Sequence, residues 1–188
     1  MKLNKKFIKG YFLMKKILVV IAIIFSIMFL THEKQEYYII PNDAIRFRVI
    51  ANSNSVFDQL VKKNVTNKLQ DKFLDTLVGL SNKEEVKDVI QNDISSYEKI
   101  VEDELNLEGV NYSYSINYGM NYFPEKVYKG LKYKAGNYES LVVTLGEGNG
   151  NNFWCLLFPP VCLMEVEDKK TTDVEYTFFI KELFNKYF

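Results

Sequence analysis

The side chains on which most hydrolases depend are scarce in this sequence. Its 188 residues include a single histidine, His32, and two cysteines. One histidine leaves no histidine pair for a metal site and no Ser-His or Cys-His pair within a folded domain. Two carboxylates can perform hydrolysis without histidine, and Asp43 and Glu147 would be the pair in an exported enzyme that acts on the cell wall. Because nothing in the sequence places these two side chains together, we expect no catalysis, no cofactor and no metal.

A glycine-rich stretch at residues 146–150 is the second feature that could carry chemistry. Loops that bind phosphate combine such glycines with a Lys-Ser or Lys-Thr pair and with the N-terminus of a helix. Here Gly146, Glu147 and Gly148 lead instead into an apolar and aromatic segment. We therefore interpret the stretch as a connection between two strands, in which glycine supplies backbone angles that other residues avoid.

Arg46 and Arg48 are the only arginines among the 24 basic residues of the chain. Where lysine serves every other positive position, two arginines indicate a geometric need. A guanidinium can hold a carboxylate through two parallel hydrogen bonds, which lysine cannot do. The alternatives are a salt bridge within the protein, with Asp43 and Glu147 as candidate partners, and stacking on a tyrosine ring.

The first 30 residues differ in charge from the rest of the chain. Six of the 24 basic residues and none of the 24 acidic ones lie there, and residues 17–30 form an unbroken run of low polarity. Cations followed by such a run are typical of export signals. We expect residues 1–30 to be a cytoplasmic basic segment and signal or anchor helix, 31–40 a tether, and 41–188 an exported domain. The chain is neutral overall, so we expect no nucleic-acid partner.

Cys155 and Cys162 have six residues between them. On an exported chain this pair predicts a disulfide, which would close the loop that contains Pro159 and Pro160. A redox centre would favour the closer Cys-x-x-Cys spacing. Two buried free thiols are the alternative.

Hydrophobic periodicity predicts the elements that position these residues. Apolar and polar residues alternate over residues 44–51, which predicts a strand with both arginines on its polar face. A turn at Asn52 and Ser53 follows. Ser55 is placed to cap a helix whose apolar residues recur every three or four positions and which ends at Gly79.

A second helix is predicted to begin at a capping box formed by Ser81 and Glu84 and to end before Gly109. The two helices should pack as an antiparallel hairpin. From residue 110 onward the period changes to two, which predicts strands over residues 110–118, 126–133, 139–145 and 153–158. The fold class is therefore α+β: an N-terminal signal or anchor helix, a strand, a two-helix hairpin and a mainly antiparallel sheet.

Residues 146–162 read GEGNGNNFWCLLFPPVC. This block resembles the stage II sporulation protein R family, whose hallmark is a Gly-Glu-Gly loop, an Asn-Trp-Trp-Cys strand, Phe-Pro-Pro and a second cysteine. Residues 40–55, IPNDAIRFRVIANSNS, are similar to the opening strand and Asn-Ser turn of the same family. Phe153 stands where the family commonly has its first tryptophan, so Trp154 is the only indole of the chain.

The resemblance implies signalling during endospore formation. Members of the family are made in the forespore and exported into the space between the forespore and mother-cell membranes. There they activate a membrane-embedded aspartic protease of the mother cell, which processes an inactive sigma-factor precursor. The resemblance thus implies a secreted or membrane-anchored signalling protein that is not an enzyme. Its partners would be that protease and, through residues 17–30, the membrane.

The positions that match the family are our candidates for the partner-binding surface. A tryptophan and a preshaped loop are typical of binding hot spots, so we expect the glycine loop and the segment around Trp154 to contact the partner. The alternative is a core tryptophan beneath a structural loop. The candidates are Arg46, Arg48, Asn52, Ser53, Gly146, Glu147, Gly148, Asn152, Trp154, Pro159 and Pro160.

Overall fold

The computed structural model describes residues 5–30, 38–128, 131–161, 182 and 185–187. The chain divides into two compact units, Met1–Glu36 and Tyr37–Phe188. Each is described by itself.

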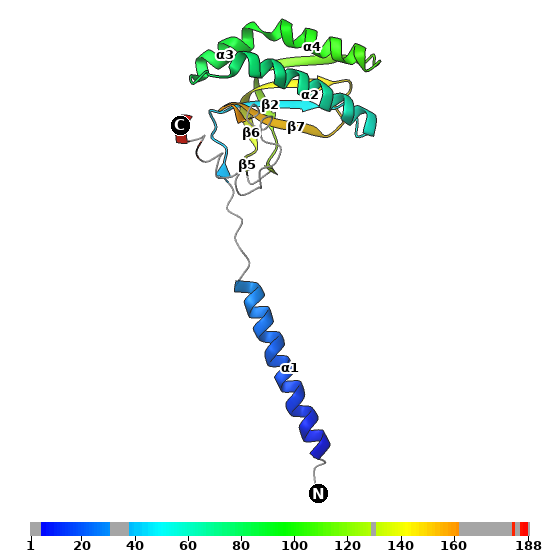
Figure 1. The fold of residues 1–188 in the computed structure, drawn as a ribbon, viewed down its shortest axis with the longest axis vertical. Coiled ribbons are helices and arrows are strands. Elements are labelled where there is room, and N and C mark those ends of the chain that lie inside the picture. The colour runs from blue at the N-terminus through cyan, green and yellow to red at the C-terminus, as the bar shows by residue number, and fades with distance from the viewer. Residues whose placement is uncertain (1–4, 31–37, 129–130, 162–181, 183–184, 188) are drawn as a thin grey trace. The chain divides into compact units, whose positions relative to one another are not determined.

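The first unit contains one helix, α1 (Lys5–Leu30), drawn in dark blue in Figure 1. Its apolar side chains between Met14 and Phe25 are exposed. The predicted anchor, residues 17–30, falls in this helix. Within the described part of the chain, no helix is both long and apolar enough to cross a bilayer.

The second unit is built on a four-stranded sheet with the strand order β3-β6-β2-β7. Its strands are β2 (Ile45–Ile50), β3 (Tyr114–Phe123), β6 (Gly136–Leu145) and β7 (Asn152–Phe158). β2 runs parallel to β6, whereas β3 and β7 are antiparallel to their neighbours. The predicted α+β class with a mainly antiparallel sheet is therefore confirmed.

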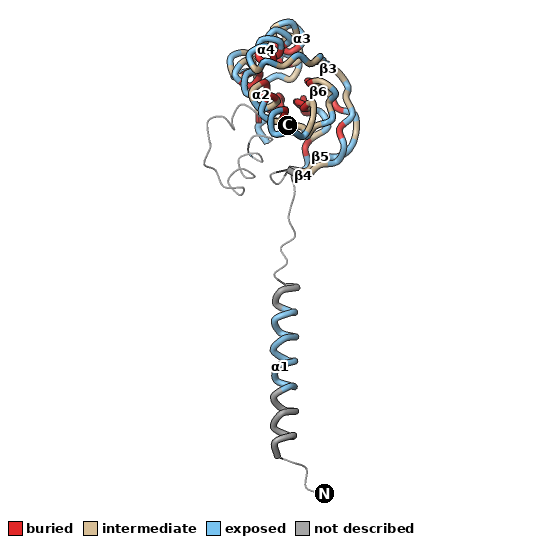
Figure 2. The backbone as a smooth tube through the Cα atoms, turned by 90° about the vertical axis from the view of Figure 1, so that its right-hand side faces the viewer, coloured by how far each residue is buried: buried red, intermediate tan, exposed pale blue. Residues whose placement is uncertain are grey.

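Three helices cover one face of this sheet: α2 (Val56–Leu77), α3 (Lys83–Asn92) and α4 (Ile94–Leu107) (Figure 1). The apolar residues of β2 point toward them, as the alternation predicted. The Phe47 ring meets Phe73 of α2 with centroids 5.1 Å apart, and Phe73 meets Tyr97 of α4 at 5.3 Å. All three side chains are fully buried. Figure 2 marks the buried positions of this unit in red along its strands and helices. Burial of a large apolar side chain stabilises the fold by about 1.5–3 kcal/mol.

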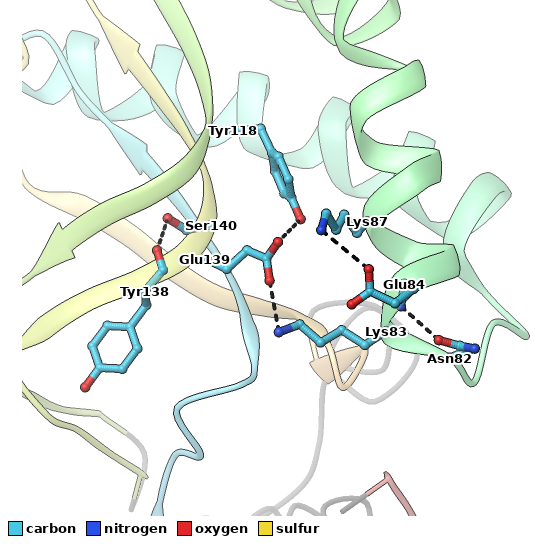
Figure 3. A network of polar contacts seen from close by, with 8 residues as sticks. All are labelled: Asn82, Lys83, Glu84, Lys87, Tyr118, Tyr138, Glu139 and Ser140. Carbon is cyan, nitrogen blue, oxygen red and sulfur yellow. Dashed lines mark hydrogen bonds and ion pairs between the residues drawn. The ribbon is translucent and has the colours of Figure 1, made fainter.

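Helix α3 is held to the sheet by Glu139 of β6 (Figure 3). Lys83, the first residue of the helix, forms a 2.9 Å ion pair with this carboxylate, and the Tyr118 hydroxyl of β3 donates to it at 3.0 Å. The helix is capped by Asn82, whose side chain accepts from the backbone N–H of Glu84. These contacts fix one end of the helical layer on the sheet.

A small second sheet lies on the other side of the main sheet, where it contacts Arg46 through Tyr133. It has the order β1-β5-β4. Its strands are β1 (Tyr38–Ile39), β4 (Lys126–Tyr128) and β5 (Leu131–Tyr133). The predicted strand over residues 126–133 is thus two short antiparallel strands.

The predicted second helix is divided at Asp93, so the two-helix hairpin consists of three helices. The Asp93 backbone N–H caps α3 by donating to the carbonyl of Val89, and its carboxylate pairs with Lys72 of α2 at 3.1 Å. The cap of α3 is also Asn82 rather than the predicted Ser81.

Candidate functional site

The Asn-Ser turn and the glycine loop form one structure at one end of the main sheet. The turn follows β2, and the loop joins β6 to β7, the two neighbours of β2. Because β2 and β6 are parallel, both segments begin at the same end of the strands. The backbone N–H of Asn149 donates to the carbonyl of Asn52 at 3.0 Å, and that of Gly150 donates to the carbonyl of Ala51 at 2.9 Å.

Side chains of the turn complete the junction. The Asn52 Oδ1 atom accepts from the backbone N–H of Glu147 at 2.9 Å, and the Asn54 Oδ1 atom accepts from that of Asn151 at 2.8 Å. Four hydrogen bonds thus join two segments that are far apart in the sequence. Bonds of this kind pair the backbone donors of a loop that leaves the sheet.

The glycines of the loop are required by this close approach. A Cβ atom on Gly146 would lie 2.2 Å from Asn52 Oδ1, and one on Gly150 would lie 2.3 Å from the carbonyl oxygen of Ser53. Gly146 and Gly148 also have φ values of 57° and 66°, in the left-handed region. The glycine-rich composition therefore reflects docking against the turn, and the loop leads into strand β7 rather than into a helix.

A buried carboxylate, Asp58, ties the turn to the helical layer. Its oxygens accept hydrogen bonds from the Asn52 amide at 3.0 Å, from the Ser53 hydroxyl and from the Tyr112 hydroxyl. Its backbone N–H donates to Ser55 Oγ at 3.0 Å, which caps α2. The hydrogen bond from Ser53, followed by that from Tyr112, lowers the pKa of Asp58 although burial opposes the shift.

Asp58 was not among the candidates from the sequence. A signal was present, because Ser55 and Asp58 have the spacing of a capping box, with an acid in the first helical turn. That pattern indicates a local cap. It does not indicate that the carboxylate would face inward and accept from Tyr112, which lies 54 positions away.

Helix α2 also holds the loop directly. The Lys62 Nζ atom donates to the carbonyl of Asn151 at 2.9 Å and to the Gln59 side chain at 2.6 Å. Gln59 in turn donates to the carbonyl of Ser53 at 2.9 Å. Burial, with a smaller contribution from Lys126, lowers the pKa of Lys62. Turn, loop and helix are therefore joined in one hydrogen-bonded network.

Arg46 and Arg48 lie on the face of the main sheet opposite the helices. The Arg46 side chain is 0% exposed, and its Cζ atom lies 3.3 Å from the ring centroid of Tyr138. The Arg48 Cζ atom lies 4.6 Å from the centroid of Phe123. Burial lowers the pKa of both groups. Of the three uses predicted for the pair, the structure shows stacking on aromatic rings.

Trp154 belongs to the same aromatic cluster rather than to the surface. Its side chain is 7% exposed, and its ring meets Phe123 at 5.0 Å and Tyr133 at 5.6 Å. Lys126 places its Nζ atom 5.0 Å from the indole centroid. The structure thus shows the core position that was the alternative for Trp154, and contact of the indole with a partner stays a prediction.

The remaining candidates lie along β7 and after it. Asn152 begins the strand and is half-buried, and Pro159 and Pro160 follow its end, with a cis bond before Pro159. Cys155 is disulfide-bonded and buried in the strand. Cys162 lies outside the described residues, so its predicted pairing with Cys155 stays a prediction.

The structure does not bring Asp43 and Glu147 together. Asp43 precedes β2, whereas Glu147 follows β6, and these neighbouring strands are parallel. The two residues therefore lie at opposite ends of the sheet, roughly 20 Å or more apart at about 3.3 Å per strand residue. Paired catalytic carboxylates of glycosidases are about 5–10 Å apart. The carboxylate pair considered for a cell-wall enzyme is thus not formed.

The comparisons with known proteins point to one family. The family model described as stage II sporulation protein R (spore_II_R) matches residues 41–168, which include both the turn and the loop. Stage II sporulation protein R of Bacillus subtilis (strain 168) is 35% identical over 127 residues, covering 68% of this chain and 57% of that protein. The match thus spans less than two thirds of the relative. No solved structure matches the chain. On these two matches, the chain belongs to the stage II sporulation protein R family.

Proposed function

We propose that this protein is an exported signal of endospore formation that acts by contact with another protein. Family membership supports a role in sporulation. In the proposed mechanism, the domain binds a membrane-embedded aspartic protease of the mother cell and activates it. The protease then processes an inactive sigma-factor precursor. The protein itself breaks no bond.

Export is supported by the N-terminal sequence. Residues 1–30 combine six lysines with an apolar run and contain no acid, which is the pattern of an export signal. The folded unit that follows, Tyr37–Phe188, is separate from Met1–Glu36. We propose that it works in the space between the forespore and mother-cell membranes, either released or held by the N-terminal segment.

The junction of turn and loop is the observation that carries the proposal. Its exposed side chains form what we call the turn–loop surface: Asn54, Val56, Glu147, Asn149 and Asn151. Val56 is 89% exposed although it is apolar. Four hydrogen bonds between the turn and the loop hold the surface in one shape before any partner binds. A preorganised surface loses little conformational freedom on binding, which favours recognition.

The experiment is complementation of a strain that lacks the gene. Processing of the sigma-factor precursor is measured by immunoblot after expression of the full chain or of a variant with Glu147→Ala and Asn149→Ala. Both side chains are exposed, so the variant should fold. We expect wild-type protein to restore processing and the variant to lower it at least tenfold.

The matched control is Glu85→Ala, which removes an exposed acid from α3, away from the turn and the loop. It should restore processing fully. Normal processing with the turn–loop variant, at an equal protein level, would contradict this use of the surface. Release of fragments from peptidoglycan by the purified protein would contradict the non-enzymatic part of the proposal.

A further inference from the structure

Two arginine charges share one aromatic ring on the face of the main sheet that the helices leave uncovered. The Cζ atoms of Arg46 and Arg48 lie 5.4 Å and 4.6 Å from the centroid of Phe123. The two cations are therefore within about one Debye length of each other, so they repel. Among the described residues, neither arginine forms an ion pair. The small second sheet has an ion pair of its own, between Lys132 and Glu125 at 3.4 Å.

Several hydrogen-bond donor atoms of these arginines also lack an acceptor among the described residues. Stacking on Tyr138 occupies the flat face of the Arg46 guanidinium, whereas its N–H groups point outward in the plane. In the part of the chain that the structure describes, Nε, Nη1 and Nη2 of Arg46 and Nε of Arg48 are buried without an acceptor. Buried donors without an acceptor destabilise a fold, and native proteins rarely leave them so.

A third basic side chain lies close to the two arginines. Lys126 lies over the ring of Trp154, which itself packs against Phe123. Burial lowers the pKa of Arg46 and of Arg48, and tyrosines are the groups that oppose this shift at Arg46. Among the described residues, no carboxylate pairs with either arginine, and buried donors of both lack an acceptor.

We infer that Arg46 and Arg48 form a binding site for a carboxylate from an acidic segment of a partner polypeptide. Arg48 is half-buried, whereas Arg46 is fully buried, so Arg48 would contact the carboxylate and Arg46 would add its positive charge. A guanidinium matches a carboxylate through two parallel hydrogen bonds. The inference deepens the proposed function by naming the chemistry of a contact with the partner.

The rest of this face suits a polypeptide better than a lipid. Val142 of β6 pairs with Arg48 of β2 on one side and with Asn117 of β3 on the other, so these three residues lie in one row across the sheet. Ser115 and Thr144 continue the same face one pair further along, and the side chains of these two residues and of Asn117 are not buried. Amides and hydroxyls at these positions can bond peptide groups next to the carboxylate, whereas acyl chains would gain nothing from them.

Binding can be measured with the purified full-length chain in neutral detergent. Trp154 is the only tryptophan and packs in this aromatic cluster, so its fluorescence reports directly on the site. Hexaglutamate peptide is the probe, with hexaglutamine as the neutral control. We expect a saturable change with hexaglutamate alone. Arg48→Gln should weaken the affinity at least tenfold, and Arg48→Lys, which keeps the charge without the fork, should weaken it by less.

Lys63→Gln is the matched control, because it removes one positive charge from an exposed position on α2, in the opposite layer. It should change the affinity less than twofold. Circular dichroism on heating verifies that each variant is folded. If Arg48→Gln does not fold, the affinity of Arg48→Lys is the one compared with that of the wild type. An unchanged affinity in the folded Arg48 variant would overturn the inference.

Two further outcomes would also overturn it. Inorganic phosphate that binds as tightly as hexaglutamate would show a general anion site. Binding of phosphatidylglycerol in mixed micelles, without binding of the peptide, would show a lipid site. The proposed function is tested separately, by complementation. If wild-type protein restores processing but does not bind hexaglutamate, this inference fails while the proposed function stands.

Discussion

The Tyr112 hydroxyl donates a hydrogen bond to the Asp58 carboxylate across 54 positions of the sequence. Asp58 lies in the first turn of α2, and Tyr112 lies just before β3, at the far edge of the main sheet. The same carboxylate accepts from Asn52 and Ser53 of the turn. One buried side chain thus connects helix α2, the segment that leads into β3 and the Asn-Ser turn.

Removal of this carboxylate should destabilise the domain and loosen the turn. Asp58→Ala leaves the donors of Asn52, Ser53 and Tyr112 without their acceptor, and we expect the free energy of unfolding to fall by about 2–4 kcal/mol. Urea unfolding followed by circular dichroism measures the loss. Asp71→Ala, at an exposed acid of the same helix, should change it by less than about 0.5 kcal/mol. Equal effects in both variants would refute the role of Asp58.

The same network predicts how stability depends on pH at the acidic end. The hydrogen bonds from Ser53 and Tyr112 hold the pKa of Asp58 below its ordinary value of 3.8. Folding therefore favours the charged form. The stabilisation is present above the ordinary pKa and is lost as the pH falls through the lower folded pKa. Urea unfolding between about pH 2 and pH 7 should show this loss, and it should be smaller in Tyr112→Phe.

At the alkaline end the sign is reversed. Burial, followed by the hydrogen bond to Asp58, raises the pKa of Tyr112 from 10.0 to about 12. Folding thus favours the protonated phenol, and its contribution is full below the unfolded pKa of 10.0 and is lost as the pH rises through about 12. Tyrosinate absorbance, measured as the folded protein is titrated to alkaline pH, reports each tyrosine that ionises. Compared with the wild type, Tyr112→Phe should lack one tyrosine that ionises near pH 12. A wild-type Tyr112 that ionises near its ordinary pKa would be inconsistent with the network.

Alanine substitutions at Gly146 and Gly109 distinguish the cost of a steric clash from the cost of backbone strain. Both have left-handed φ values, 57° and 68°, but a Cβ on Gly146 would meet Asn52 Oδ1 at 2.2 Å, whereas one on Gly109 has nothing within 4 Å. Alanine at Gly109 should cost about 1–2 kcal/mol through backbone strain alone. Alanine at Gly146 should cost about 3–5 kcal/mol, because the clash adds to the strain. Thermal or urea unfolding measures both. Equal losses would mean that the turn does not dock rigidly against the loop.

The aromatic support of Arg46 is tested at Tyr138. The guanidinium carbon lies 3.3 Å from the centroid of this ring. Tyr138→Phe keeps the ring and should change the free energy of unfolding by less than about 1 kcal/mol, whereas Tyr138→Leu removes it and should cost about 2–3 kcal/mol. Indistinguishable effects of the two variants would show that stacking contributes little at this site.

Local patterns predicted the parts of the fold that depend on local burial. Ile45, Phe47 and Val49 alternate because one face of β2 meets the helices, and α2 follows its three- and four-residue spacing for the same reason. The division at Asp93 was not predicted, because the apolar spacing continues through it. A salt bridge to Lys72, on another helix, accompanies the break.

The candidate site was predicted in composition but not in arrangement. The turn and the loop were both identified, yet their contact depends on β2 lying between β6 and β7, which no local pattern encodes. The buried position of Arg46 could not be predicted either. A cation on the polar face of a strand is ordinarily solvated, and here β5 brings Tyr133 over it. Asp58 was missed because its partner Tyr112 comes from a distant segment.

The most direct test of the account asks from which compartment this protein signals. Conversion of the sigma-factor precursor is followed by immunoblot in a strain that lacks the gene and expresses one of three forms. These are the full chain, residues 31–188 alone, and residues 31–188 behind an unrelated cleavable export signal. We predict that the first and third forms restore conversion and that the second, retained in the cytosol as a folded domain, does not. Full conversion by the cytosolic form would contradict the account.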